Sequence, residues 1–291
     1  MVSDYKRLHN YTLVTPPTSA SFEALWFNFH NTVLANHSEV RKAIADAIDY
    51  QTLIEALPLE ASELCTEHSS LFHPGYDPAD PCPLYDPASA IQLLDSNGWV
   101  RGPDGVWTKA GQRLEFEYTL PIIADDPTRF SIETIVQRDL QVIGIKLDLQ
   151  NIPEEAFFNG AIQAGEASPP TGALPGRNDI LEIAYNPSYD PDDSSLFACD
   201  QFFPNGGNLF YCNHALDALY QQELTTLDPG ARQNIFAQIH LIYLKDFPMV
   251  VLYGDKEIYL VHTGTHNFQP SPVGAYAADN IWEWWCDGGK C

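Results

Sequence analysis

The chain has 291 residues, with 15 Lys and Arg against 39 Asp and Glu, which gives a formal charge of −24 at pH 7. A phosphate backbone repels so acidic a surface, and no run of basic residues exceeds two, so nucleic acid is not an expected partner. Hydrophobic residues make up 45% of the chain and aromatic residues 12%, which excludes an acidic disordered tail and is enough to bury a core.

Hydrophobic periodicity predicts an α/β chain. Alternating or continuous apolar runs indicate strands, and apolar residues three and four positions apart indicate helices. The segment 114–149 reads as strand, helix and strand in succession, which predicts a βαβ unit with parallel pairing. The predicted strands are 24–29, 114–120, 145–149, 180–185, 248–252 and 257–261, and the predicted helices are 39–49, 87–97, 132–142, 213–225 and 229–245.

Helix boundaries carry local signals. Ser38 is the expected N-cap of the helix 39–49, and Asn97-Gly98 and Gly144 are expected to end the second and third helices. Two stretches, 58–87 and 165–178, are rich in Pro and have little periodicity, so they are expected to be loops.

Membrane and export signals are not found in this sequence. No apolar run approaches the roughly 20 residues that span a bilayer, so direct membrane insertion of this chain is not expected. The segment from Met1 to His9 lacks an apolar stretch followed by a small-residue cleavage site, so it does not read as a signal peptide.

The cysteines fall into three close pairs along the chain. Pairing by proximity predicts three short disulfide loops, which persist in an oxidising compartment. Other connectivities, and six reduced thiols, remain open alternatives. The predicted pairs are Cys65 with Cys82, Cys199 with Cys212, and Cys286 with Cys291.

One possible metal site competes with the first of these pairs. Cys65, His68, His73 and Cys82 offer two thiols and two imidazoles, the donors of a tetrahedral zinc site. Their spacing matches no standard zinc knuckle, so the disulfide is favoured and no metal is expected.

Catalytic signatures are also missing from the sequence. Nucleophile-elbow, Walker A, dinucleotide and zinc-protease motifs are not found, and the many acidic residues make any carboxylate pair a weak signal. The sequence therefore predicts neither an enzyme nor a bound cofactor.

Several motifs in a fixed order carry a family resemblance. They are the helix from Val40 to Asp49 (VRKAIADAID), the segment from Tyr85 to Trp99 with its Tyr-Asp-Pro start and Gly-Trp end, the dipeptide Asp190-Pro191, and the apolar segment from Phe247 to Tyr253. In this order they resemble the C-terminal half of extracellular solute-binding proteins of family 5, the peptide and nickel receptors of ABC importers. Their positions are core-facing or helix-starting ones, so they identify the architecture and not the ligand.

The resemblance implies the large C-terminal α/β lobe of a type II periplasmic-binding-protein (Venus-flytrap) fold, with a remnant of the first lobe. The expected ligand-binding lobe is 31–245, and 1–30 with 246–291 are expected to be crossing strands and the remnant. We expect truncation to have removed the family's signal peptide or lipid anchor, together with most of the first lobe.

The implied function is that of the substrate-binding component, or a fragment of it, of an ABC importer for peptides or another small organic solute. It would bind by lobe closure without covalent chemistry, in the periplasm or at the cell surface, with ABC permease subunits as partners. The alternative is a solute-binding-like lobe reused as a sensor or interaction module, and a hydrolase is the least favoured reading.

Expected ligand contacts follow from the resemblance. Peptide-binding members use an acidic residue shortly before Asp-Pro, preceded by Trp; the ungapped equivalents here are Pro187 and Ala184, and a shift of one residue brings Tyr185 into the aromatic position. An arginine expected after Leu120 is missing, although Arg129 lies nearby. The predicted contacts are Tyr185, Asn186, Tyr189, Asn28 and Arg129, with simple packing for Tyr185 and an Asn-Pro turn for Asn186 left open.

Overall fold

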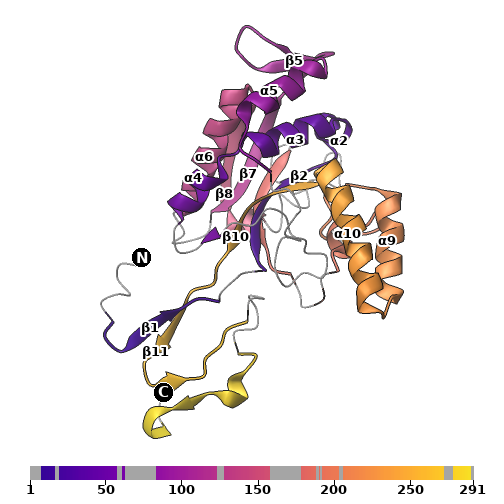
Figure 1. Cartoon of the computed structure of the whole chain (residues 1–291). Helices are drawn as coiled ribbons and strands as arrows, with labels where there is room; N and C mark the ends of the chain where they lie inside the picture. Colours follow the sequence, from indigo (N-terminus) through magenta and orange to yellow (C-terminus); the bar gives the residue numbers. More distant parts are fainter. Residues whose placement is uncertain are drawn as a thin grey trace.

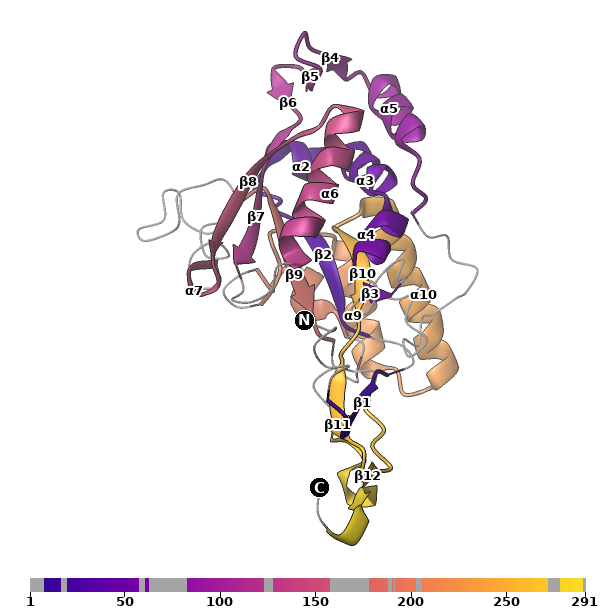
Figure 2. The same cartoon turned by 90° about the vertical axis from the view of Figure 1, so that its left-hand side faces the viewer.

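The computed structural model describes residues 8–16, 20–57, 61–62, 83–122, 128–157, 178–187, 190, 192–202, 206–271 and 278–289. Its main body is a six-stranded sheet with helices on both faces, from which a narrow two-stranded ribbon projects (Figures 1 and 2). The sheet strands are β2 (Phe22–Phe27), β3 (Ala61–Ser62), β7 (Glu115–Ile122), β8 (Lys146–Pro153), β9 (Ile180–Tyr185) and β10 (Met249–Asp255).

The sheet is mixed, in the order β3-β10-β2-β9-β7-β8. Strand β7 pairs in parallel with β8 and with β9, whereas β2 is antiparallel to both β9 and β10. The predicted βαβ unit is confirmed, because α6 (Thr128–Ile143) connects β7 to its parallel neighbour β8. Four strands, β7 to β10, therefore run in one direction, and β2 and β3 run in the other.

Two helical layers cover the sheet (Figure 2). Alternate residues of β2 point to opposite faces, so Leu25 and Phe27 enter one core and Ala24 and Trp26 the other. The first core packs against α2 (Thr32–Asn36), α3 (Ser38–Ala47), α4 (Tyr50–Ala56), α5 (Pro87–Ser96) and α6, and the second against α8 (Ser194–Phe197), α9 (His214–Thr225) and α10 (Pro229–Asp246).

A buried arginine of α3 joins the ends of two other helices. Arg41, in α3, is 4% exposed, and its guanidinium donates to the carbonyl of Leu34 at the end of α2. It also donates from Nε to the carbonyls of Asp246 (2.7 Å) and Phe247 (3.0 Å) at the end of α10. The last carbonyls of a helix have no partner within it, so Arg41 satisfies groups that are otherwise unpaired.

Most predicted elements are confirmed, with one correction at a helix start. Ser38 is the first residue of α3 and His37 is its N-cap, which makes no side-chain capping bond. The predicted stops are confirmed by the backbone: Gly98 and Gly144 have φ of 82° and 85°, the left-handed region that ends helices. The predicted loops 58–87 and 165–178 lie mostly outside the described residues.

Three small sheets complete the structure. The strands β4 (Val100–Arg101), β5 (Trp107–Lys109) and β6 (Gln112–Arg113) form a hairpin-like sheet at one end of the body, which was not among the predicted elements. At the other end β1 (Tyr11–Val14) pairs with β11 (Tyr259–His262) in the ribbon. Beyond it lie β12 (Thr265–His266), β13 (Trp285–Cys286), η5 (Ile281–Glu283) and η6 (Asp287–Gly289), and a three-residue helix α7 (Glu154–Ala156) follows β8.

Two strands of the main sheet fall inside the segments that were expected to form crossing strands and the first-lobe remnant. Strands β2 and β10, which fall inside the expected segments 1–30 and 246–291, are inner strands of the six-stranded sheet. The ribbon β1–β11 is the part of these segments that leaves the body (Figure 1). The boundaries at residues 30 and 246 stay a prediction.

Candidate functional site

The carboxyl ends of four strands meet at one edge of the sheet. Strands β7, β8, β9 and β10 all end there, and β2 enters there at Phe22, opposite Tyr185. The ribbon β1–β11 continues from this edge (Figure 1). In open α/β sheets, ligands bind in the crevice outside the carboxyl ends of the strands. We call this end of the sheet the carboxyl edge.

Tyr185 is the last residue of β9 and lies at the carboxyl edge within a group of aromatic rings. Its ring centroid is 5.6 Å from that of Phe22 and 6.3 Å from that of Trp26, which stacks in turn on Phe197 at 6.1 Å. Burial, with a smaller contribution from the Asp193 carboxylate, raises the pKa of Tyr185 to about 12. The half-buried phenol therefore remains protonated and offers both a ring face and a hydroxyl.

The residues after β9 are only partly described. Asn186 directly follows Tyr185 at the carboxyl edge and is exposed. Tyr189, the third predicted contact in this segment, lies outside the described residues. The structure thus places Tyr185 and Asn186 together, and their role as ligand contacts stays a prediction.

Asn28 lies at the other end of the sheet. It follows the last residue of β2, and its backbone N–H donates to the carbonyl of Asp179 (3.0 Å), just before β9 begins. Its side-chain Oδ1 accepts from the backbone N–H of His30 (2.9 Å), and the residue is 5% exposed. The length of β2 separates Asn28 from Tyr185, so the structure does not bring these two predicted contacts together.

Arg129 lies at the carboxyl edge, in the first turn of α6, but it is already paired. Its Nη1 and Nη2 donate to Oε1 (3.1 Å) and Oε2 (3.0 Å) of Glu23, near the start of β2. Both side chains are at most 9% exposed. A guanidinium held by two bonds to a buried carboxylate is largely neutralised, so a ligand carboxylate would have to compete with Glu23.

Two acidic residues at this edge were missed by sequence reasoning. Glu23 and Glu182 are 2% and 0% exposed, and each lies within an otherwise apolar strand. Burial and the nearby Glu23 carboxylate raise the pKa of Glu182 well above its usual range. The available signal was a charged residue at a position of the strand that points into the core.

A pair of helices holds the segment that follows β9. Arg232 of α10 donates both to Asp190, in the expected ligand loop, and to the fully buried Glu223 of α9. Its guanidinium carbon also lies 5.2 Å from the ring centroid of Phe236. The Asp190 side chain is thereby tied to the α9–α10 pair.

The predicted Cys199–Cys212 disulfide is confirmed. It joins the end of α8 to the residues before α9. Cys286 is also disulfide-bonded, to a partner outside the described residues. Cys65, Cys82 and Cys291 lie outside the described residues too, together with the zinc alternative, so those pairings stay predictions.

The described residues contain one cluster with metal-ligand atoms, formed by Cys199, Cys212 and His214. Because the two sulfurs are joined in a disulfide, they are not thiolate ligands, and we assign no metal there. Among the described helices, none is long and apolar enough to cross a membrane.

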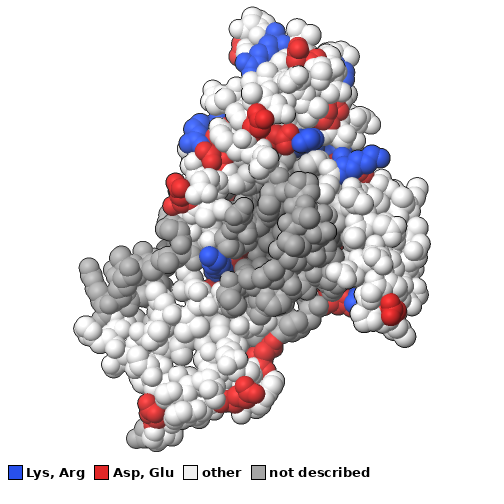
Figure 3. All heavy atoms as spheres, in the orientation of Figure 1, with Lys and Arg blue, Asp and Glu red and all other residues white. Residues whose placement is uncertain are grey.

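Basic side chains gather away from the carboxyl edge. Arg101, Lys109 and Arg113 lie on the small sheet β4–β6, and Lys146 begins β8 beside it. Figure 3 shows blue groups at this upper end of the molecule. Several are held in surface ion pairs, such as Arg113 with Asp104 at 2.6 Å and Lys146 with Glu115 at 2.7 Å.

Comparison with known proteins gives a consistent result. Residues 2–190 match the family model described as bacterial extracellular solute-binding proteins, family 5 Middle. Among curated proteins, the di/tripeptide-binding protein 1 of Pseudomonas aeruginosa is 24% identical over 242 residues, which cover 81% of this chain and 40% of the relative. Di/tripeptide-binding protein 3 of the same species is 23% identical over 280 residues, covering 94% of this chain and 48% of the relative.

Solved structures show the same fold. NikZ from Campylobacter jejuni, in complex with Ni(L-His), superposes with a TM-score of 0.79 at 21% identity, covering 97% of this chain and 55% of that one. The oligopeptide-binding protein AppA from Bacillus subtilis, with a nonapeptide, gives 0.78 at 22% identity, covering 98% and 55%. The fold is that of the type II periplasmic-binding proteins, and this chain spans about half the length of the relatives it matches.

Proposed function

Because the chain belongs to the bacterial extracellular solute-binding proteins of family 5, we propose that it forms one wall of a ligand cleft in the receptor of an ABC importer. Members of this family are non-enzymatic solute-binding proteins, and we propose the same for this chain. Peptides are the favoured ligand class, since curated relatives are di/tripeptide-binding proteins and one structural relative holds a nonapeptide.

The observation that supports this proposal is the carboxyl edge. Four strand ends, the half-buried ring of Tyr185 and the exposed amide of Asn186 occur together there. An aromatic face with one nearby amide suits the side chains and backbone of a peptide. The ribbon that leaves the same edge is where a second lobe would connect, so that closure covers the ligand (Figure 1).

The proposed ligand site differs from that of a receptor which captures both ends of a dipeptide. The position expected to carry an amine-binding acid holds Pro187, and Arg129 is paired with Glu23. We therefore propose that recognition relies on aromatic packing and amide hydrogen bonds more than on the terminal charges. Permease subunits as partners, and a periplasmic or cell-surface location, belong to the same proposal.

Nuclear magnetic resonance titration of the isotope-labelled chain tests this function. One wall of a cleft binds weakly, so a method that detects millimolar affinity is needed. We expect a neutral pentapeptide to shift the amide signals of residues 20–23, 184–187 and 253–255, while maltose and Ni(L-His) do not. Signals of the β4–β6 sheet serve as the internal control. Shifts confined to that sheet, or no shift with any peptide, would contradict the proposal.

Matched variants locate the contact. Tyr185→Ala should weaken peptide binding by about tenfold, or ~1.4 kcal/mol, whereas Tyr185→Phe keeps the ring and should bind nearly as well. Asn186→Ala should also weaken binding, and Asn97→Ala, at the exposed end of α5, is its control. Equal affinity of Tyr185→Ala and the unmodified chain would place the ligand elsewhere.

A further inference from the structure

Glu182 occupies an unusual place for an acidic side chain. It lies in β9, an inner strand of the sheet, is 0% exposed, and is paired in register with Leu25 of β2. Its backbone neighbours Leu181 and Ile183 pack into the core on the opposite face of the sheet. Among the described residues, neither carboxylate oxygen of Glu182 has a hydrogen-bond partner. A buried carboxylate in this condition is strongly destabilised when ionised.

A second carboxylate lies on the same face. Glu23 is two residues before Leu25 in β2, so its side chain and that of Glu182 point to the same side of the sheet. Arg129 of α6 donates hydrogen bonds from both terminal nitrogens to Glu23. The positive charge of Arg129 is therefore used to balance Glu23 and not Glu182. Within the described part of the chain, the cluster thus has two buried carboxylates and one arginine.

Other titratable groups surround this cluster. Tyr253 of β10 is paired in register with Glu23, and its pKa is raised by burial and by the carboxylates of Glu23 and Glu182. From β7, Tyr118 lies on the same face, paired with Ile180. From α6, Glu133 is 3% exposed and accepts from Asn151, and burial raises its pKa too. These three described groups are all neutral or acidic, so none of them adds positive charge beside Glu182.

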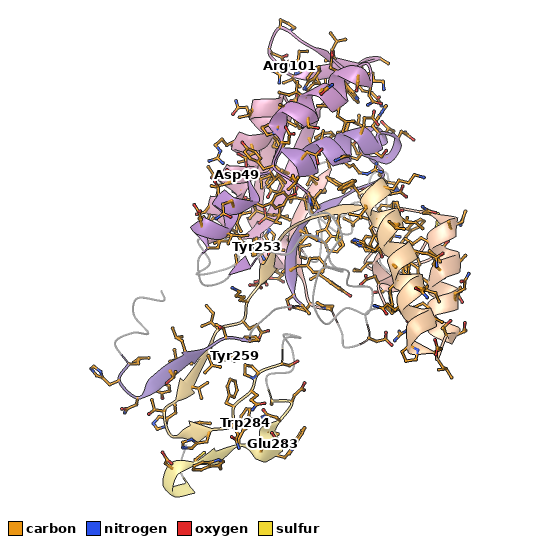
Figure 4. All side chains as sticks on the ribbon, viewed as in Figure 1. Asp49, Arg101, Tyr253, Tyr259, Glu283 and Trp284 are labelled. Carbon is orange, nitrogen blue, oxygen red and sulfur yellow. A yellow bond between two sulfur atoms is a disulfide. The ribbon has the colours of Figure 1, made fainter. Side chains whose placement is uncertain are left out.

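The cluster lies where the ribbon leaves the body. Phe22 and Gly254 form the last pair of β2 and β10 at the carboxyl edge, directly beside Glu23 and Tyr253. Figure 4 shows Tyr253 at the point where β10 leaves the sheet and Tyr259 farther along, on the ribbon. The Arg129–Glu23 pair therefore fastens α6 to the strand that leads into the ribbon.

We propose that Glu182 is a buried proton-binding site, occupied at neutral pH, and that the bound proton keeps the Arg129–Glu23 pair intact at the root of the ribbon. An ionised Glu182 repels Glu23 and competes with it for Arg129. Loss of the proton therefore loosens the attachment of β2 and β10 at this edge. This inference concerns the folded chain and does not depend on the identity of a ligand.

The direction of the pH effect follows from linkage. The folded chain holds a proton on Glu182 at pH values where the unfolded chain has released it, because the folded pKa is raised. The stabilisation is fully present below the unfolded pKa of about 4.3 and is lost as the pH rises through the folded pKa. Between these two pKa values, each rise of one pH unit increases the unfolding equilibrium constant by about tenfold, because the folded chain holds one more proton than the unfolded chain.

Urea unfolding from pH 5 to pH 9 tests the proposal. Glu182→Gln imitates the protonated acid, so it should remove this part of the pH dependence, and its stability relative to the unmodified chain should rise with pH. Glu133→Gln, also a buried acid but placed beside Asn151, is the matched control and should keep the Glu182 contribution. Parallel pH profiles for Glu182→Gln and the unmodified chain would overturn the proposal.

Two measurements on the unmodified chain support the test if the variant folds poorly. Infrared spectroscopy at neutral pH should show the C=O stretch of a protonated, buried carboxylic acid, which disappears at alkaline pH. Hydrogen exchange should then become faster in residues 20–27 and 250–262 than in the β4–β6 sheet. No protonated carboxyl band at neutral pH, or an alkaline loosening that spares these two segments, would refute the assignment.

Discussion

Replacing the buried side chain of Arg41 should strongly destabilise the fold. Its guanidinium serves carbonyls at the ends of two helices, and the side chain also lies over the ring of Phe29 with its guanidinium carbon 5.0 Å from the centroid. Burial lowers the pKa of Arg41 to about 10, so at pH 7 the group remains charged. Arg41→Met keeps most of the apolar stem and removes every donor.

The expected magnitude follows from the acceptors that lose their donor. Leu34, Asp246 and Phe247 each present a carbonyl to Arg41, and an unsatisfied buried acceptor costs about 1–3 kcal/mol. Water reaches part of this site, since a neighbouring cavity of about 410 Å³ is lined by Arg41, Tyr211 and others. We therefore expect a loss of roughly 3–5 kcal/mol, the range observed on breaking buried charge interactions.

Urea unfolding followed by circular dichroism measures this loss. Arg41→Lys keeps the charge but not the planar set of donors, so it should lie between the unmodified chain and Arg41→Met. The control is Arg113→Met, because the side chains of Arg113 and its partner Asp104 are 40% and 49% exposed, so loss of their surface ion pair should change stability little. A loss below about 1 kcal/mol for Arg41→Met would refute the reasoning.

Two further changes test the covalent and backbone constraints. Replacing Cys199 and Cys212 together by Ser should lower the unfolding free energy by about 3 kcal/mol, as expected for a loop of this size; a melting temperature unchanged by the double substitution would contradict this. Gly144→Ala should cost more than Gly98→Ala, since both have positive φ but only at Gly144 would a Cβ lie 2.6 Å from the carbonyl oxygen of Gly105. Gly98→Ala should cost about 1–2 kcal/mol from the left-handed backbone alone, and equal losses measured by urea unfolding would show that the close contact relaxes.

Local sequence signals predicted the regular elements well. The helix α5 has both of its signals in the sequence, Pro87 in the first turn and Gly98 after the end, and the structure confirms them. The parallel pairing of β7 and β8 followed from the connecting helix alone. Such features depend on a few neighbouring residues, so one sequence is enough to predict them.

Long-range pairings were beyond the sequence pattern. Nothing local indicates that Arg129 meets Glu23, since 106 positions separate them along the chain. The same holds for Arg41 and the end of α10, which are about 205 residues apart. The short strands β4 to β6 escaped prediction because two or three residues carry too little periodicity to register.

The candidate site was predicted in part for the same reason. Tyr185 and Asn186 follow a strand that the sequence reveals, so their place at its end was foreseeable. Asn28 also follows a strand, but β2 runs in the opposite direction, which puts Asn28 at the far end of the sheet. The direction of a strand depends on the topology of the whole sheet, and the apolar pattern of residues 24–29 does not indicate it.

The strand order also bears on when the chain can fold during synthesis. Strand β2 spans Phe22–Phe27, yet one of its neighbours in the sheet, β10, spans Met249–Asp255 and is therefore made much later. At about 5–20 residues per second, more than ten seconds separate the synthesis of these two strands. Until then β2 has an open edge on that side, which is a site for unwanted pairing with other chains. The central sheet is therefore completed only after β10 has been made, long after β2.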